Sequence, residues 1–175
     1  MPIDTSIDFV SINIAVITIS DSRTIENDTS GDTLEKRIKE SGHNMLKRII
    51  IPDDVQQIKD TLDTMSKDKE VDCIITTGGT GLTGRDTTPE AVKEIASKHI
   101  DGFGELFRQV SFEKIGTSAI QSRAVAALIN STYVFCLPGS TGACKDGWDE
   151  ILKYQLDIRH KPCNFVEIMP RLNEK

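Results

Sequence analysis

A glycine-rich stretch is the part of this chain whose residue types most clearly suggest chemistry. The segment DCIITTGGTGLTGRDTTPEA covers residues 72–91 and contains Gly78, Gly79, Gly81 and Gly84. Glycine permits positive φ and lets a ligand approach backbone amides closely. Several amides that point the same way form a concavity that binds anions.

The loop over residues 76–86 therefore predicts a phosphate-binding cradle, with a flexible surface loop as the alternative. A helix is expected to start at Thr88 and Pro89, and its positive dipole end would lie nearby. The loop is not a Walker A motif, since no GK[ST] follows at the required spacing. It is not the GxGxxG dinucleotide fingerprint either.

A second loop, LPGSTGA at residues 137–143, follows the same logic after another predicted strand. Pro138 and Gly139 form the turn, and the hydroxyls of Ser140 and Thr141 could donate to an anion. Alternatively, Ser140 only caps the following helix. Both roles are compatible, because a ligand at that helix terminus would meet the same amides.

Acidic residues flank both regions. Asp86 ends the glycine loop, and Asp53 and Asp54 follow the second predicted strand. A carboxylate beside a phosphate is repelled unless a cation lies between them, and Mg²⁺ commonly binds through one or two carboxylates plus substrate phosphates. The alternatives are that Asp53 or Asp54 caps a helix and that Asp86 starts one. In SDSR, Asp21 and Arg23 form a loop salt bridge, or Arg23 contacts an anion.

The elements that must position these residues alternate between strand and helix. Strands are expected at 12–19, 45–51, 71–77 and 132–138, and helices from 29–32 to Gly42, at 55–65, from 88, at 103–114, at 118–130 and from 141 towards 155. Strands separated by helices of this length predict a mostly parallel sheet with helices on both faces. Ligands in such sheets bind beyond the carboxyl ends of the strands, where the loops 20–23, 52–54, 76–86 and 138–141 would meet.

Composition fits one α/β domain over residues 1–175, with irregular termini at 1–11 and 166–175 and an irregular tail from Arg159. The chain has 175 residues, a net charge of −6 and a pI near 5.1, which argues against a nucleic-acid or polybasic membrane role. Its four cysteines contain no CxxC pair and are expected to be reduced thiols. The N-terminus lacks a basic region before its apolar stretch, so a cytoplasmic protein is expected. Neither zinc-ligand spacing nor a nucleophile–His–acid arrangement is evident.

Several of these motifs together resemble a known family. TISDSR, TTGGTGLTGRDTTPEA, GFGELFR, QSRA, LPGST and PCNF are similar, in this order, to the MoaB/MogA family of molybdenum cofactor biosynthesis proteins. The similarity covers roughly residues 13–165. The segment KDGWDEILKYQLDIRHKPCNF resembles the MoaB branch more than MogA.

The resemblance implies a three-layer αβα domain that binds molybdopterin, an anionic pterin with a dithiolene and a terminal phosphate. In active members, molybdopterin and Mg-ATP react to give adenylyl-molybdopterin and pyrophosphate. Members form homo-oligomers, either trimers or hexamers, and GELFR at 104–108 would lie near subunit contacts. A carrier that binds molybdopterin without turning ATP over, or a structural interaction module, are the competing hypotheses.

The family's functional residues map onto matching positions of this sequence. Asp53 and Asp86 would be the catalytic acids and would bind Mg²⁺ or its waters. Because of its place in the glycine loop, Asp86→Ala is expected nearly to abolish ATP-dependent adenylylation while leaving the fold intact. The ligand-binding residues would be Ser20, Asp21, Thr77, Gly78, Gly79, Thr80, Gly81, Pro138, Gly139 and Ser140.

Overall fold

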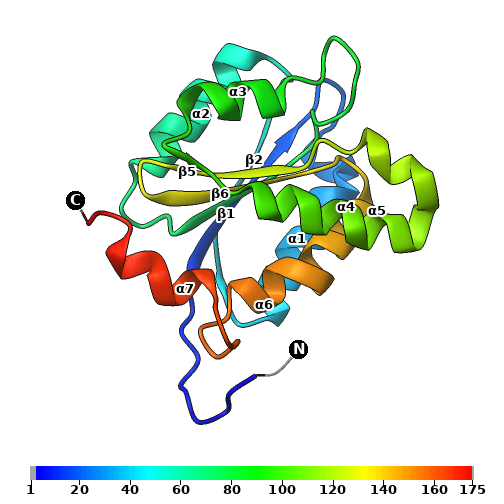
Figure 1. Cartoon of the computed structure of the whole chain (residues 1–175). Coiled ribbons are helices and arrows are strands. Elements are labelled where there is room, and N and C mark those ends of the chain that lie inside the picture. The colour runs from blue at the N-terminus through cyan, green and yellow to red at the C-terminus, as the bar shows by residue number, and fades with distance from the viewer. Residues whose placement is uncertain (1–2, 175) are drawn as a thin grey trace.

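The computed structural model describes residues 3–174, which form a three-layer αβα domain (Figure 1). The strands are β1 (Asn13–Ile19), β2 (Asn44–Ile51), β3 (Cys73–Thr77), β4 (Lys98–His99), β5 (Val125–Ile129) and β6 (Thr132–Leu137). The α-helices are α1 (Thr29–Glu40), α2 (Val55–Ser66), α3 (Thr88–Ile95), α4 (Asp101–Ile115), α5 (Thr141–Gly147), α6 (Lys153–Gln155) and α7 (Phe165–Ile168). Four short 3-10 or π segments complete the chain: η1 (Ile25–Asn27), η2 (Gly116–Gln121), η3 (Trp148–Leu152) and η4 (Met169–Arg171). Within this part of the chain, no helix has the length and apolarity needed to cross a membrane.

The six strands form one sheet in the order β2-β1-β3-β6-β5-β4. The first four in this order are parallel, while β5 runs antiparallel to β6 and β4 runs antiparallel to β5. The chain moves from β1 outward to β2 and then crosses back to β3 on the other side of β1. This change of direction between β1 and β3 is a topological switch point, where open parallel sheets place their ligands.

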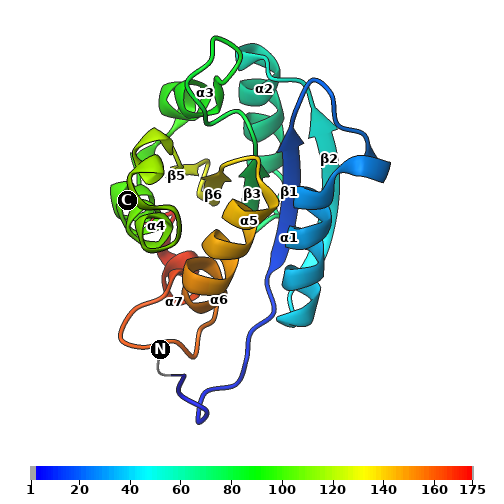
Figure 2. The ribbon, with the colours of Figure 1, turned by 90° about the vertical axis from the view of Figure 1, so that its right-hand side faces the viewer.

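Side chains along each central strand alternate between two cores. On one face, α2 and α3 cover Ala15, Ile17 and Ile74, among others. On the other face, α1, α4 and the helices after β6 cover Ile14 and Val16 with their neighbours. Figures 1 and 2 show these two helical layers on opposite sides of the sheet. Because both faces of the central strands β1, β3 and β6 are buried, these strands are almost entirely buried and mostly apolar, which confirms the predicted fold class.

The helix expected at residues 118–130 is wrong. Residues 116–121 form η2, and the next residues are the antiparallel strand β5. Asn130 and Ser131 have φ of 47° and 68° and connect β5 to β6 as a two-residue hairpin turn. The alanine spacing suggested a helix, but Ala126 and Ala127 lie on opposite faces of a sheet that is buried on both sides. The short strand β4 was also not predicted.

The tail from Arg159, including residues 166–175, was expected to be irregular, but it contains α7 and η4. Asn164 is the N-cap of α7, with its side-chain oxygen accepting from the N–H of Glu167 at 2.8 Å. Its side-chain nitrogen donates to the carbonyls of Ile158 and His160. Asn and Glu at this spacing form a helix-start signal that could have been recognised in the sequence. A helix of four residues is too short to be stable by itself, so α7 is stabilised by packing, chiefly through buried Val166.

A buried ion pair attaches the start of α1 to β2. Asp28 is the N-cap of α1 and is 1% exposed. Its carboxylate accepts from the N–H of Gly31 at 2.9 Å, from Thr18 Oγ1 at 2.7 Å and from Arg48 Nη2 at 2.8 Å. Burial alone would raise the pKa of Asp28, but these three donors outweigh it and lower the pKa. Asp28 is therefore a buried charge that depends on Arg48.

Replacing Arg48 with alanine should lower the free energy of unfolding by about 3 kcal/mol at pH 7, because it leaves the Asp28 carboxylate buried without its cation. Chemical denaturation would measure the change. The lowered pKa means that ionised Asp28 contributes stability above its unfolded pKa and loses it as the pH falls through the folded pKa. The difference between the two proteins should therefore shrink in acid.

Lys36→Ala is the control for this prediction, since Lys36 forms only an exposed pair with Glu40 at 3.8 Å. It should change the stability by less than about 0.5 kcal/mol. An equal effect of the two substitutions would show that the buried pair adds nothing beyond a surface pair.

Candidate functional site

The carboxyl ends of β1, β3 and β6 converge on one cleft of about 430 Å³, called here the strand-end cleft. It lies at the switch point of the sheet. Its walls come from the loop after β1, the glycine loop after β3, the loop after β6 and the start of α1, and include Ser20, Arg23, Asp28, Ser30, Thr77, Gly78, Gly79, Thr80, Gly81, Pro138, Gly139 and Ser140. The structure thus brings together all the expected ligand-binding residues except Asp21.

Hydrogen bonds fasten the loops after β3 and β6 to each other. Gly78 donates its N–H to the carbonyl of Leu137 at 3.0 Å. Thr77 Oγ1 donates to the carbonyl of Pro138 at 3.0 Å. From α1, Ser30 Oγ donates to the carbonyl of Gly139 at 2.9 Å. The floor of the cleft is therefore a single hydrogen-bonded unit rather than a flexible loop.

The glycines are required by the protein's own packing. Gly78 has a φ of +109°, and a Cβ atom there would lie 2.1 Å from the carbonyl oxygen of Ile19. Gly79 has a φ of +62°, and its Cβ would lie 2.3 Å from Thr88 Oγ1 and 2.8 Å from Asp53 Oδ2. Both positions exclude side chains even without a ligand, because backbone and carboxylate atoms already occupy the space.

The same turn leaves backbone donors at the cleft. Within residues 3–174, the N–H groups of Gly79 and Thr80 have no hydrogen-bond partner. Ser140, the N-cap of α5, accepts from the N–H of Ala143 at 3.1 Å through its Oγ. The predicted cap role of Ser140 is confirmed, and its hydroxyl proton remains available at the cleft wall. Donors without an internal acceptor at a concave surface are suited to an anionic ligand.

Asp53 lies behind Gly79, outside the lining of the cleft, and is 8% exposed. Its Oδ1 accepts from the N–H of Thr87 at 3.2 Å and from Thr87 Oγ1 at 3.0 Å. Burial raises the pKa of Asp53, the bonds from Thr87 partly offset this, and the carboxylates of Asp86 and Asp21 raise it further. Asp53 is thus a buried acid close to like charges. Within residues 3–174 it forms no salt bridge, and Arg85, which pairs with Asp21, interacts with it only at longer range.

The neighbouring acids have different environments. Asp54, rather than Asp53, caps α2, since its Oδ1 accepts from the N–H of Gln57 at 2.9 Å. Asp86 accepts from Thr83 Oγ1 at 2.6 Å and from the N–H of Thr83 at 2.9 Å. These bonds lower the pKa of Asp86. Asp86 therefore holds the glycine loop in shape and is not the residue that starts α3, whose N-cap is Thr87.

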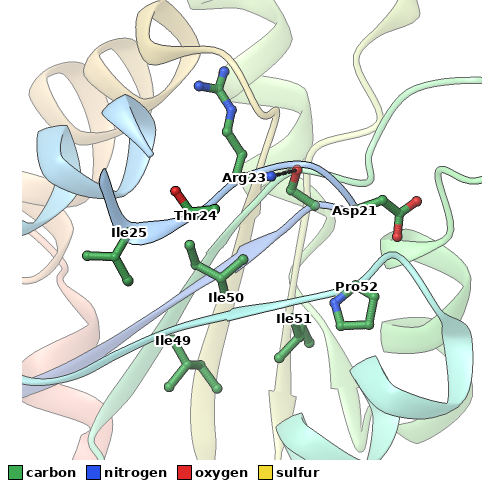
Figure 3. A pocket seen from close by; sticks show the side chains of 9 residues that line it. Asp21, Arg23, Thr24, Ile25, Ile49, Ile50, Ile51 and Pro52 are labelled. Atoms are coloured by element: carbon green, nitrogen blue, oxygen red, sulfur yellow. Dashed lines mark hydrogen bonds between the residues drawn. The ribbon is translucent and has the colours of Figure 1, made fainter. Parts of the chain in front are cut away.

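Asp21 and Arg23 do not form a salt bridge with each other. The Asp21 carboxylate pairs with Arg85 at 2.7 Å and accepts from the N–H of Asp53 at 3.1 Å. The two side chains point apart in Figure 3, which shows a neighbouring groove of about 640 Å³ between β2 and the loop after β1. Arg23 lines this groove and the strand-end cleft, so it is the basic side chain in a position to contact an anion there.

Three structural residues of the site were missed from the sequence. Asp28 and Ser30 line the cleft from α1, and Arg123 binds the back of the glycine loop. The stretch NDTSG at the start of α1 is a typical helix-start pattern, so the cap at Asp28 could have been predicted. Nothing in the sequence indicated that the same residues would form a wall of the cleft.

The fold and the cleft define an α/β protein with a ligand site at the strand ends of a parallel sheet. Comparison with known proteins narrows this class. Residues 15–158 match the family described as "Probable molybdopterin binding domain". Molybdenum cofactor biosynthesis protein B of Escherichia coli K12 is 42% identical over 160 residues, which cover 91% of this chain and 94% of that protein.

Solved structures agree with this match. A crystal structure of molybdenum cofactor biosynthesis protein B has a TM-score of 0.85 and 36% identity, covering 95% of this chain and 98% of that one. The tungsten cofactor synthesizing protein MoaB from Pyrococcus furiosus has a TM-score of 0.72 and 34% identity, covering 81% and 91% of the two chains. The chain therefore belongs to the MoaB/MogA family of molybdenum cofactor biosynthesis proteins, on the side of MoaB.

Two adjacent aspartates should respond oppositely to substitution. Asp53→Asn should leave the protein at least as stable as the wild type at pH 7, because it removes a buried charge whose pKa is raised. Asp54→Ala should lower stability by about 1 kcal/mol, because it removes a helix cap. Urea unfolding with EDTA present would measure both changes.

The effect of Asp53→Asn should depend on pH. A raised folded pKa means that the protonated carboxyl contributes stability below the unfolded pKa, near 3.9, and that this is lost as the pH rises through the folded pKa. The free energy of unfolding of Asp53→Asn relative to the wild type should therefore increase as the pH rises from the unfolded to the folded pKa of Asp53, and should stay constant above it. A variant that is less stable than the wild type at pH 7 would contradict the assignment of Asp53 as an unfavourably buried charge.

Proposed function

We propose that this protein binds molybdopterin in the strand-end cleft and adenylylates its terminal phosphate with Mg-ATP. The observation that supports this most directly is the convergence of three strand-end loops on one cleft, beside a buried and unfavourably charged acid. Membership in a molybdopterin-binding family supports the pterin as ligand. The adenylylation step is an inference from the chemistry of the residues around the cleft.

Charges around the cleft fit an anionic ligand despite the net charge of −6. Asp28 is the ionised carboxylate in the cleft lining, and Arg48 neutralises it at 2.8 Å. The lining also holds the free N–H groups of Gly79 and Thr80 and the guanidinium of Arg23. A phosphate would therefore meet donors and a cation rather than uncompensated negative charge.

The residues fit a divalent cation between the ligand and the acids. Within residues 3–174 there is no cluster of three or more potential metal ligands, so a dedicated metal cage is not expected. Mg²⁺ often binds through only one or two carboxylates plus substrate phosphates. Burial is the main cause of the raised pKa of Asp53, and the Asp86 carboxylate adds to it, so a cation between the two acids would relieve their repulsion. When bound with ATP, Mg²⁺ would neutralise charge developing on the transferred group.

The chain itself would act mainly by positioning. The attacking group, a phosphate of molybdopterin, is already anionic near neutral pH and needs no general base. The backbone donors of the glycine loop and the Ser140 hydroxyl would fix the reacting phosphates in line. Holding two anions together in this way can lower a barrier by several kcal/mol without any covalent intermediate.

The test is incubation with molybdopterin, ATP and Mg²⁺, with pyrophosphate release and the adenylylated product as readouts. The wild type should form both. Asp53→Asn should lower the rate by at least about a hundredfold, on the scale of losing one charged group that stabilises a transition state, although it is expected to be no less stable.

Asp54→Ala is the matched control, since it alters the adjacent carboxylate without touching the site, and it should retain nearly the full rate. Molybdopterin binding without pyrophosphate release would instead identify a carrier. Absence of both binding and release would contradict the proposal altogether.

We also propose that the protein forms a homotrimer, alone or as half of a hexamer. Phe112, Ile115 and Ile120 are 58%, 58% and 83% exposed on α4 and η2. Beside them, a hollow of about 310 Å³ reaches Pro138 and Ser140 at the cleft. Large exposed apolar side chains grouped this way are typical of subunit contacts. Assembly through this surface would enclose one side of the cleft.

The free thiols also support the expected cytoplasmic location. Cys73, Cys136 and Cys144 are buried and reduced, as is usual for proteins in a reducing compartment.

Charge placed on this surface should prevent assembly. Ile120→Glu is expected to shift the protein from trimers to monomers in analytical ultracentrifugation, because it would bury an unpaired carboxylate at the contact. Ile168→Glu, on α7 where Ile168 is 47% exposed, is the control and should leave the assembly unchanged. Trimers of normal stability in the Ile120→Glu protein would place the contact elsewhere.

A further inference from the structure

Two residues from separate motifs have no role so far, although they contact each other. Glu90 belongs to TPEA at the start of α3, and Arg123 belongs to QSRA before β5. They are 33 residues apart, and Arg123 Nη1 forms an ion pair with a Glu90 carboxylate oxygen. Neither residue lines the strand-end cleft.

The rest of the Arg123 guanidinium binds carbonyls of the glycine loop. Its Nε donates to the carbonyl of Gly81 at 2.8 Å, with a longer contact of 3.4 Å to that of Thr80. Its Nη2 donates to the carbonyl of Asp86 at 2.8 Å. A planar guanidinium presents donors in a rigid fork, so one side chain fixes both ends of the loop at once.

Fixing these carbonyls also fixes N–H groups on the other side of the same peptide units. In a planar trans peptide, the C=O and the following N–H point in opposite directions. Arg123 Nε holds Gly81 from both sides, through the 2.8 Å bond to the Gly81 carbonyl in unit 81–82 and the 3.4 Å contact with the Thr80 carbonyl in unit 80–81. The N–H of Gly81, which shares unit 80–81 with the Thr80 carbonyl, faces the Asp86 carboxylate. The carbonyl of Asp86 is joined to the N–H of Thr87, which donates to Asp53 Oδ1 at 3.2 Å.

We propose that Arg123, oriented by Glu90, is a positioning residue that holds the peptide units 80–81 and 86–87 so that their N–H groups orient the carboxylates of Asp53 and Asp86 beside the cleft. This inference rests on the proposed function, because it gives Asp53 and Asp86 their working positions. Arg123 donates to loop carbonyls rather than to the carboxylates of the two acids, so it positions them through peptide bonds. Its charge also lowers the pKa of Asp86.

A lysine cannot replace this arrangement. Its ammonium is a single point on a flexible stem, so it can keep a contact with Glu90 or with one carbonyl but cannot span both ends of the loop. Arg123→Lys therefore preserves the charge and removes the fork. Arg123→Ala removes both, and comparison of the two separates charge from geometry.

The first experiment needs no ligand. Amide hydrogen exchange of the free protein should become faster at Gly81 and Thr87 in both variants, while the amides of β1 and β3 keep their wild-type rates. Arg37→Ala is the matched control, since it removes a different arginine–carboxylate ion pair, with Asp149, that does not involve the glycine loop. Unchanged exchange at Gly81 and Thr87 in Arg123→Lys would overturn the inference, whatever the activity of the protein.

The second experiment measures adenylylation kinetics of the full-length variants with molybdopterin, ATP and Mg²⁺. Arg123→Lys should lower kcat by about ten- to hundredfold, a loss expected when catalytic groups are misplaced by about 1 Å. Its melting temperature should fall no more than that of Arg37→Ala. A wild-type kcat in a variant with fast loop exchange would overturn the positioning role.

Failure of the proposed function has a different signature. If the wild type itself forms no adenylylated product, the function is wrong, and the exchange experiment still decides whether Arg123 orders the two peptide units. If the wild type is active and Arg123→Lys is equally active with normal exchange, only the role of Arg123 is wrong.

Discussion

The close contact between Gly78 and the carbonyl of Ile19 is the constraint on which the site depends. A side chain at Gly78 would collide with that carbonyl at 2.1 Å, so the chain can leave β3 beside β1 only as glycine in a left-handed turn. The turn directs the N–H of Gly78 to Leu137 in the next strand and thereby joins two strand ends. The cleft at the switch point is a consequence of this joint. The packing of the protein itself requires these glycines, and the turn that they form also exposes backbone N–H groups to a ligand.

Two buried acids near the cleft, Asp28 and Asp53, differ in how far the fold compensates their charge. Asp28 is stabilised by three donors, one of which is the guanidinium of Arg48, so its charge is compensated within the fold. Asp53 accepts hydrogen bonds from the N–H and hydroxyl of Thr87, while its burial, and to a lesser degree the carboxylates of Asp86 and Asp21, raise its pKa. An uncompensated buried charge lowers stability unless something outside the chain offsets it. Proteins commonly retain such destabilising groups at functional sites, which makes Asp53 the more informative of the two acids.

Much of this arrangement could be predicted from the sequence, because local signals and packing agreed. The β-branched runs of β1 and β3, the proline after β2 and the TP pair at α3 each indicate their element directly. The prediction failed at residues 118–130, where alanine spacing was mistaken for helical periodicity. Small residues suit any tightly packed surface, so they do not distinguish a helix from a strand buried on both faces. The hairpin signal at Asn130 and Ser131 was weaker than an Asn-Gly turn.

Local sequence patterns also predict only part of the arrangement of single residues in the site. Predicted residues such as Gly78 and Ser140 meet because strand ends of a parallel sheet must meet, and this topology follows from the order of elements. The positions of Asp53, Asp86 and Arg123 relative to one another depend on how a loop of ten residues folds back, which no periodicity specifies. A site built from backbone N–H groups has few side chains of its own, so its shape must be set by residues outside it. Motif residues outside the cleft, such as Glu90 and Arg123, are then the part of the sequence that determines the shape of the site.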